Sequence, residues 1–384
     1  MMSTAAPTGV DLEVCCGSGG CKGLYQVGLL RALPPRHLDR VGRASGVSAG
    51  SLTAACLVAP SPRAVLTEFM NTALHEPLVP HGNRMWRAAR RMLRHRDALY
   101  DGHLMEDMVR RVVPRPARGK RLDVGVKPLL QARQVNVPLT SSSDHNAVVD
   151  ALLASTAILG VFPPRDLGPG LGRCVDGGYI SGMHVSRMQQ AVNGREPRVL
   201  MCVACVPNAT PDAAADMSYL GEHGSDVMDA FDAMGKPDAH HDGGVRHAMG
   251  QFLEHALRLA NMGDSARLRH ALGLRQMPDG VFAALYADNL GAHPVVFNAQ
   301  TPASQLPDAP PASARPMGLL FCAPRVADGF QTTLGDMDTL TGPQERRTAM
   351  LERYVDVGRE AAVDASQLLD TLAQLTVARR PTSS

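Results

Sequence analysis

A serine with small neighbours is the first residue of this chain whose setting suggests chemistry. The stretch GVSAG, from Gly46 to Gly50, fits the pattern G-x-S-x-G with Ser48 at its centre. Small flanking residues let such a serine occupy a strained turn between a strand and a helix, with its hydroxyl exposed. This setting suits a nucleophile that attacks an ester. The alternative is that Ser48 only caps the helix that follows.

A glycine-rich loop precedes this serine. The residues CCGSGGCKG, 15–23, stand between an apolar run and a helical pattern, where backbone N–H groups can meet a negative charge. A phosphate-binding P-loop needs Gly-Lys-Ser/Thr, but here Cys21 precedes Lys22 and Gly23 follows it. A dinucleotide fingerprint would place its first glycine at Ser18. An oxyanion hole fits better, and the donors that we expect are the N–H groups of Gly19, Gly20 and Cys21.

A carboxylate on a glycine turn is the third candidate. Asp176 begins the sequence D-G-G after a short apolar stretch, where it could orient or deprotonate a serine hydroxyl. Alone, D-G-G is an ordinary turn. A histidine beyond Asp176 could instead complete a Ser, Asp, His triad. We expect these histidines to lie on the surface or in the core, and His184 is the strongest candidate among them because it follows Asp176 by eight residues. The histidines are His184, His223, His240, His241, His247 and His255.

The elements that must position these residues alternate between strands and helices. Apolar runs followed by glycine turns and helical patterns occur at residues 11–33 and again at 40–59. Further strands are predicted at 121–126, 132–137 and 198–206, and a helix at 143–156. A largely helical stretch spans 62–113, a loop spans 300–316, and a long amphipathic helix spans 344–377. The alternation predicts an α/β fold with a mainly parallel central sheet flanked by helices.

The composition predicts a folded chain whose main partner is not nucleic acid. Its 384 residues are 45% hydrophobic, enough to bury the core of one large domain or two ordinary ones. A formal net charge of +2 lacks the basic balance typical of nucleic-acid binding. The first residues show no secretory signal, and no apolar run approaches the roughly 18 residues of a spanning helix. We expect a cytoplasmic location by default, with peripheral membrane association or specialised secretion as alternatives.

The eight cysteines do not suggest a disulfide framework, because several lie within apolar runs of a long chain. Cys202 and Cys205 have metal-like spacing. Residues three apart on a strand face opposite sides, however, and no second Cys or His pair follows. We therefore expect buried thiols, with no metal and no cofactor.

Together the three motifs resemble those of the patatin-like phospholipases. That family has a glycine-rich loop ending in Arg/Lys-Gly, then G-x-S-x-G, then D-G-G or D-G-A, and the order and spacing match. The segments KGLYQVGLLRAL, GVSAGSLTAA and ASTAILGVFPP are also similar to family sequence. Ser18 stands where the family usually has the first of three glycines, and a φ above zero would be costly for a serine there.

The resemblance implies a patatin-like three-layer sandwich at residues 10–206, with 62–113 as a helical insertion. It does not extend beyond residue 206, where we expect a helix-rich C-terminal region, 207–384, that could dock on membrane, bind a partner or complete the core. It also implies that Ser48 is the nucleophile and Asp176 its only side-chain partner, a Ser-Asp dyad beside an oxyanion hole. The positions that support the motifs are Lys22, Gly23, Gly46, Gly50, Gly177 and Gly178.

A basic amphipathic helix is predicted within the insertion, in RMWRAARRMLRHR. Its arginines would face an anionic bilayer with the tryptophan at the interface. The alternatives are a solvated face on a core-packed helix and a groove for a protein partner, including an activator. The residues of this basic face are Arg84, Arg87, Arg90, Arg91 and Arg94, while Trp86 lies on the opposite, apolar face of the predicted helix.

The sequence thus predicts a serine lipid acyl hydrolase that cleaves phospholipid or lysophospholipid esters through an acyl-serine intermediate. One alternative is an acyltransferase that passes the same acyl group to an alcohol or thiol. The other is a non-catalytic lipid-binding or effector module that retains the fold.

Overall fold

The computed structural model describes most of the predicted elements that carry the three motifs. The described residues are 12–76, 102–158 except 132, 161–190 except 186 and 189, 198–207, 269–286 except 271 and 276, 294–307, 316–328 and 344–376. The basic face at 84–94 lies outside them, as do all candidate histidines beyond His184.

A mixed, largely parallel sheet forms the centre of the molecule. Among the described residues its order is β5-β6-β3-β2-β1-β7-β10-β8-β9, and β4 also pairs with β3. Strands β3, β2, β1, β7 and β10 run parallel, while the remaining pairings are antiparallel. The strands are β1 Leu12–Cys16, β2 Val41–Val47, β3 Arg121–Pro128, β4 Val135–Thr140, β5 Arg165–Asp166, β6 Arg173–Asp176, β7 Val199–Val203, β8 Phe282–Tyr286, β9 Val295–Phe297 and β10 Met317–Cys322.

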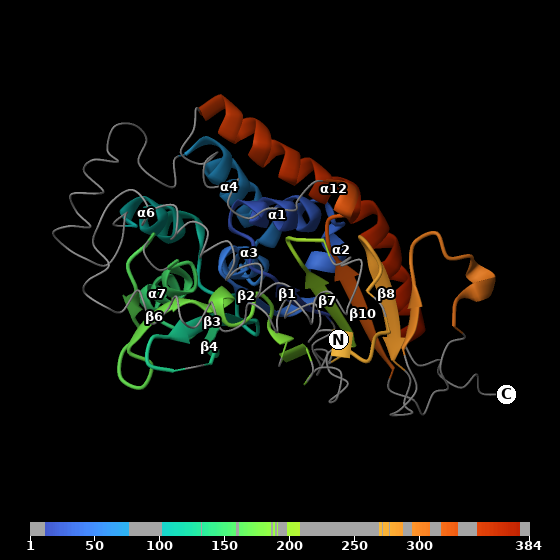
Figure 1. Cartoon of the computed structure of the whole chain (residues 1–384), viewed down its shortest axis with the longest axis horizontal. Coiled ribbons are helices and arrows are strands. Elements are labelled where there is room, and N and C mark those ends of the chain that lie inside the picture. Colours follow the sequence, from blue (N-terminus) through green and yellow to red (C-terminus); the bar gives the residue numbers. More distant parts are fainter. Residues whose placement is uncertain are drawn as a thin grey trace, which may run out of the picture.

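Helices flank this sheet, which confirms the predicted α/β class. Figure 1 shows α1, α4 and α12 together on one side of the strands, with α6 and α7 nearer β3 and β6. The helices are α1 Gly23–Ala32, α2 Pro35–Leu38, α3 Ala49–Leu57, α4 Pro62–His75, α6 His103–Val112, α7 His145–Ser155 and α12 Gln344–Thr376, with short 3-10 turns η1 Gly20–Lys22, η2 Gly177–Tyr179, η3 Ala303–Gln305 and η4 Val326–Asp328.

Helix α12 crosses α1 at very close range. A Cβ added at Gly28 would meet the backbone of Val355, and one added at Gly358 would meet the carbonyl of Tyr25. The two glycines therefore let the backbones touch, and α12 continues onto β10 and β8. This helix from the far end of the sequence thus packs directly on the helix that follows the glycine loop.

Five strands of the sheet were not predicted, namely β5, β6, β8, β9 and β10. β8, β9 and β10 come from the region after residue 207, where the sequence pattern predicted helices and a loop. β10 pairs in parallel with β7, and β8 pairs antiparallel with β10. Strands β8, β9 and β10 therefore extend the same sheet that carries the motifs.

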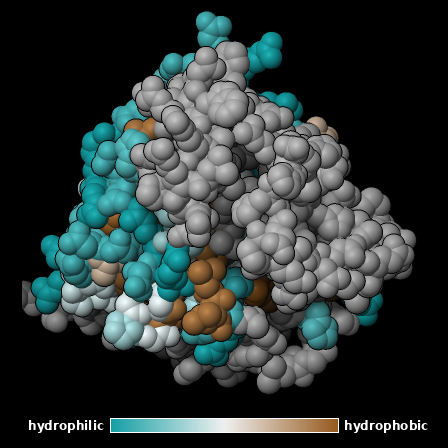
Figure 2. Space-filling view, turned by 60° about the vertical axis from the view of Figure 1, so that its left-hand side comes forward, coloured by the Kyte–Doolittle hydropathy of each residue, from teal (hydrophilic) through white to brown (hydrophobic). Residues whose placement is uncertain are grey.

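None of the helices that the structure describes combines the length and the apolar character of a membrane span. Figure 2 shows a mostly hydrophilic described surface on which hydrophobic residues gather in small groups. Among the described residues, the exposed large hydrophobic ones are Leu129, Leu130, Val295, Val296 and Val363.

Candidate active site

Ser48 occupies the turn between β2 and α3 with an unusual backbone. Its φ of 56° and ψ of −131° make it the one non-glycine residue with positive φ among those described. Such a conformation costs about 1–3 kcal/mol and persists only where the surroundings enforce it. The side chain is nearly covered, with 6% of the residue exposed. The sequence GVSAG thus forms the strained strand-to-helix turn that was predicted.

The two glycines of this motif allow the turn to close. A Cβ at Gly46 would collide with the carbonyl of Gly50, which lies one helical turn further on. A Cβ at Gly50 would collide with the carbonyls of Cys16 and Gly17. Gly50 therefore seats the turn directly against the first residues of the glycine loop, and any side chain there would push the two apart.

Two further serines hold the backbone of Ser48 in place. The N–H of Ser48 donates to Ser155 Oγ at 2.9 Å, and that hydroxyl donates to the carbonyl of Gly125 at 2.7 Å. On the other side, Ser51 donates to the carbonyl of Ser48 through its N–H at 2.9 Å and its hydroxyl at 2.6 Å. Ser155 ends α7 and Gly125 lies on β3, so three elements enforce the strained turn.

Asp176 lies opposite Ser48 at the end of β6. Its residue is 4% exposed, and its Oδ1 accepts a hydrogen bond of 2.7 Å from the N–H of Gly178. Burial raises the pKa of Asp176 to about 6, although hydrogen bonds from the Ser48 side chain and from the Gly178 backbone oppose the rise. The structure thus brings the predicted pair together across 128 residues of sequence.

Contacts with β3 fix the D-G-G turn. Asp176 pairs with Val126 in the register of the sheet. A Cβ at Gly177 would come within 2.7 Å of the Gly125 carbonyl, so the turn needs glycine. The Gln134 side-chain amide donates to the carbonyls of Gly177 at 3.3 Å and Ser181 at 3.0 Å. Gln134 was not predicted as a site residue, because its role depends on contacts more than forty residues away.

Backbone hydrogen bonds anchor the glycine loop without using two of the N–H groups that were predicted to form the oxyanion hole. Gly17 donates to Val203 at 2.8 Å, Ser18 to Gly182 at 2.7 Å, and Lys22 to Gly19 at 3.0 Å. The Gln26 side chain donates to the carbonyls of both Gly17 and Val203. The backbone hydrogen bonds of the loop therefore do not use the N–H groups of Gly19 and Gly20.

The glycine loop does not require a positive φ at Ser18. Ser18 has no positive φ, whereas Gly20 has φ 53°. The left-handed conformation therefore falls on a true glycine, where it is inexpensive. Gly20 is exposed and Cys21 is half-buried, while Lys22 is almost fully buried.

The cysteines near the loop behave as core residues. All eight are free, and seven of them are buried. Cys205 contacts Gly19, and burial raises the pKa of its thiol to about 12 although Lys22 opposes the rise. Within the described ranges, no group of three His, Cys, Asp or Glu side chains is placed to hold a metal ion.

His184 lies behind this site without joining it. Its ring nitrogen approaches Gly125, yet neither ring nitrogen has a hydrogen-bond partner. Burial lowers its pKa to about 4, so the ring is neutral at pH 7. The hydrogen bonds that shift the pKa of Asp176 come from Ser48 and Gly178. The described pair is therefore serine and aspartate without this histidine.

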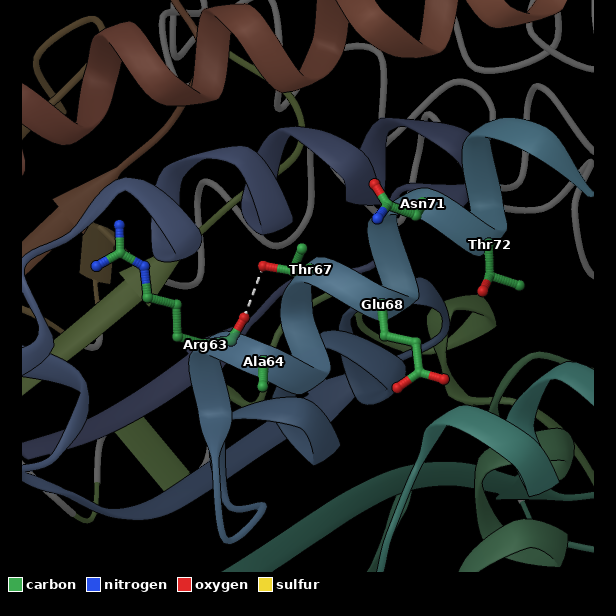
Figure 3. Close-up of a pocket in the computed structure, with 6 residues that line it drawn as sticks. All are labelled: Arg63, Ala64, Thr67, Glu68, Asn71 and Thr72. Carbon is green, nitrogen blue, oxygen red and sulfur yellow. Dashed lines mark hydrogen bonds between the residues drawn. The ribbon is translucent and has the colours of Figure 1, made fainter.

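A shallow hollow elsewhere on the surface lacks these groups. It lies along α4 and is lined by Arg63, Ala64, Thr67, Glu68, Asn71 and Thr72 (Figure 3). The Thr67 hydroxyl donates to the Arg63 carbonyl at 2.8 Å, which is an ordinary bond within a helix. The side chains of Arg63 and Glu68 point away from each other (Figure 3). Neither Ser48 nor Asp176 lines this hollow.

Comparison with known proteins agrees with the geometry. Residues 14–186, which include the glycine loop, Ser48 and Asp176, match the family model described as patatin-like phospholipase. This segment is a patatin-like phospholipase domain. The family implies a serine hydrolase with lipid acyl hydrolase activity, and hence a site that binds lipid.

Solved structures and curated sequences add little to this domain assignment. The crystal structure of VipD from Legionella pneumophila aligns with 70% of this chain and 67% of its own, at 12% identity and a TM-score of 0.29. No curated protein matches the chain in sequence. The patatin-like domain therefore rests on the family model and on its own geometry.

Replacing Ser155 by alanine should loosen the turn that carries Ser48. The change leaves the Ser48 N–H and the Gly125 carbonyl buried without this partner, which costs about 1–3 kcal/mol for an unsatisfied group. Urea unfolding should show that loss, and Ser48 should react at least tenfold more slowly with a fluorophosphonate probe. Ser142→Ala, at an exposed position, is the control. Equal probe rates in Ser155→Ala and wild type would show that the hydroxyl does not position Ser48.

The buried carboxylate should make stability depend on pH. Folding raises the pKa of Asp176 from 3.8 to about 6. Protonation of Asp176 therefore stabilises the folded state fully below about pH 4, and this contribution to the free energy of unfolding is lost as the pH rises through 6. Two pKa units correspond to about 3 kcal/mol. Asp176→Asn should therefore be more stable than wild type at pH 8 by up to about this amount, relative to their difference at pH 4.

Thermal unfolding at a series of pH values measures the difference in stability between Asp176→Asn and wild type. The control is Asp107→Asn, which makes the same replacement at an exposed position on α6. A difference for Asp176→Asn that stays flat between pH 4 and pH 8 would mean that Asp176 keeps an ordinary pKa.

Proposed function

We propose that the protein is a serine lipid acyl hydrolase that cleaves ester bonds of phospholipids or lysophospholipids through an acyl-serine intermediate. One observation carries the proposal. Ser48, on an enforced strained turn, hydrogen-bonds to a buried Asp176 whose pKa is raised to about 6. The glycine loop lies against the same turn through Gly50. A nucleophile, a base and a set of backbone donors therefore share one place.

In the first half of the reaction, Ser48 Oγ attacks the ester carbonyl carbon while Asp176 takes the hydroxyl proton. The carbonyl oxygen becomes negative, and the N–H groups of Gly19, Gly20 and Cys21 are the proposed donors to it. Each such donor contributes about 3–4 kcal/mol to transition-state stabilisation. When the carbon–oxygen bond to the glycerol side breaks, Asp176 returns the proton to the leaving alkoxide, and the acyl group stays on Ser48.

In the second half, water attacks the acyl-serine. Asp176 takes a proton from the water, the same loop stabilises the second oxyanion, and the bond to Ser48 Oγ breaks. The proton then returns to Ser48, and a fatty acid leaves. Atoms and charges balance with one water consumed for each ester cleaved.

The raised pKa makes aspartate a suitable base for this cycle. With a pKa of about 6, Asp176 is mostly ionised at pH 7 yet about a hundredfold more basic than an aspartate of pKa near 4. General bases work best when their pKa lies near the working pH. Burial of the D-G-G turn therefore supplies the basicity that the sequence alone did not reveal.

Two leucines near the site suit contact with a lipid surface. Leu129 and Leu130 form the turn after β3, and Leu130 is fully exposed. The Leu129 N–H donates to Arg173 at 2.9 Å, so the turn lies beside the strand that ends in Asp176. We propose that this tip enters the lipid surface, and that the basic face at 84–94 adds attraction to anionic lipids.

We also propose a division of labour along the chain. Residues 10–206 supply the reacting groups, with 62–113 as the insertion that meets membrane. Residues 207–384 bind membrane or a protein partner, including an activator, while β8, β10 and α12 pack against the catalytic part.

Fatty acid release from mixed phospholipid vesicles tests the dyad. Ser48→Ala should abolish release because the nucleophile is lost, and Asp176→Asn should lower kcat by at least a thousandfold because no base remains. Both variants should unfold cooperatively, and only Ser48→Ala should lose all fluorophosphonate labelling. Release by all three proteins at the same rate would overturn the dyad.

The pH dependence of the same reaction identifies the base. In wild type, kcat/KM should rise tenfold per pH unit below pH 6 and level off above it, because the ionised form of Asp176 is required. Acyl esters formed with an added alcohol, in place of free fatty acid, would favour the acyltransferase alternative.

Replacing Leu130 by glutamate should weaken binding to vesicles without changing the chemistry. Burying a leucine side chain contributes about 2 kcal/mol, so partition into vesicles should fall by a factor of roughly 30. Hydrolysis of a water-soluble short-chain ester should stay within twofold of wild type. Val363→Glu is the matched control, because Val363 is also an exposed hydrophobic residue but lies on α12. Equal losses in the two variants would refute a specific role for the tip.

A further inference from the structure

The first turn of α12 buries an arginine near the glycine loop. Arg347 is only 1% exposed, although it is the fourth residue of the helix. Helix α12 contacts both η1, which is Gly20–Lys22, and α4. The next residue, Thr348, donates to the Leu74 carbonyl at 3.4 Å. The helix therefore begins between the glycine loop and the end of α4.

The guanidinium of Arg347 lacks the partners that a buried charge requires. Its Nε and Nη2 are buried and have no hydrogen-bond partner. Burial lowers the pKa of Arg347 while the nearby Cys21 of the glycine loop opposes that change. Arginine stays protonated in proteins even so. A buried cation with two unused N–H donors is rare in native proteins unless an anion binds there.

The two unused nitrogens form the edge with which arginine grips paired oxygens. Nε–H and Nη2–H point in nearly the same direction and match two oxygens of a carboxylate or phosphate. Arg187 uses this same edge on Glu13, with bonds of 2.8 and 2.6 Å. Arg121 uses it on a single oxygen, Oδ1 of Asp123, with bonds of 3.0 and 2.9 Å. At Arg347 the corresponding edge receives no oxygen from the protein.

We propose that Arg347 binds the phosphate of the phospholipid substrate. This inference rests on the proposed function, because the glycine loop beside Arg347 is the part that holds the ester oxygen. In a glycerophospholipid the phosphate is the anion bonded nearest to the acyl esters, and it offers two charged oxygens to a guanidinium edge. Binding supplies the partner that the buried cation lacks.

The assignment gives the site a preference that its other groups do not supply. Ser48, Asp176 and the loop N–H groups act on any ester carbonyl, including those of neutral glycerides. A phosphate held by Arg347 adds binding only for lipids that carry one. A site that leaves a buried polar group unpaired discriminates strongly against ligands that lack the matching group. Phospholipids should therefore bind more tightly than diacylglycerols of the same chain length.

Binding measured without turnover tests this proposal separately from catalysis. The full-length Ser48→Ala protein is titrated by calorimetry with dihexanoylphosphatidylcholine, with dihexanoylglycerol and with inorganic phosphate. The same titrations use the double variants with Arg347→Met, which keeps the length but removes the charge, and with Arg347→Lys, which keeps the charge but removes the edge. Arg346→Met is the matched control, because Arg346 is the exposed neighbour on the same turn.

The expected result is selective. Arg347→Met should weaken phosphatidylcholine binding at least tenfold, Arg347→Lys should weaken it less, and neither should change dihexanoylglycerol binding. Arg346→Met should match the parent protein in all titrations. Melting curves report whether each variant is folded, and the lysine variant carries the test if the methionine variant is not.

Three results would overturn the proposal. One is equal phosphatidylcholine binding with and without Arg347, which would leave water as the partner of the guanidinium. Another is an equal loss for both lipids, which would make Arg347 a structural residue. The third is Arg347-dependent binding of inorganic phosphate without binding of the phospholipid, which would assign the group to free phosphate. Failure of the proposed function looks different, since wild type would then release no fatty acid and Ser48 would not react with a fluorophosphonate.

Discussion

The backbone of Ser48 is the constraint on which the site depends. A serine with φ 56° and ψ −131° is held there by hydrogen bonds from β3 and α7 through Ser155, and from α3 through Ser51. Relaxing that turn would move the hydroxyl away from Asp176. The surrounding elements thus offset the strain of this backbone and fix the orientation of one side chain, as is typical of strained functional residues.

The same constraint explains why the glycine positions are where they are. Gly46 and Gly50 are needed because carbonyl groups approach them closely, and the carbonyls that meet Gly50 belong to the end of β1 and the start of the glycine loop. Direct backbone contact therefore fixes the position of the serine turn relative to the loop. The proposed nucleophile and the proposed oxyanion donors thereby gain a fixed separation without any side chain between them.

Much of the fold around the motifs could be predicted from sequence, because its signals are local. The apolar runs with glycine turns gave β1, β2 and the helices α1 and α3, and the long amphipathic pattern gave α12. β8 to β10 were missed because they are short, apolar and separated by proline-rich or polar segments. Their strand character comes from pairing with β7, which no local window contains.

Among the site residues, too, some stand in local sequence motifs and others depend on distant contacts. Ser48, Asp176 and the glycine loop stand in motifs of a few residues, and the structure places the first two in contact, while their catalytic roles stay predictions. The raised pKa of Asp176 and the contacts of Ser155, Gln134 and Arg347 depend on burial and on distant partners. A buried arginine at the start of an otherwise solvated helix turn gives no sequence pattern that separates it from its exposed neighbour.

The close crossing of α1 and α12 has a consequence for how the protein is made. Helix α1 directly follows the glycine loop, and its packing partner α12 is separated from it by most of the chain. During synthesis the loop therefore leaves the ribosome long before the helix that packs over α1. The nascent chain therefore carries Ser48 and Asp176 before α12 has been made, and the packing of α12 on α1 follows only after that helix has been synthesised.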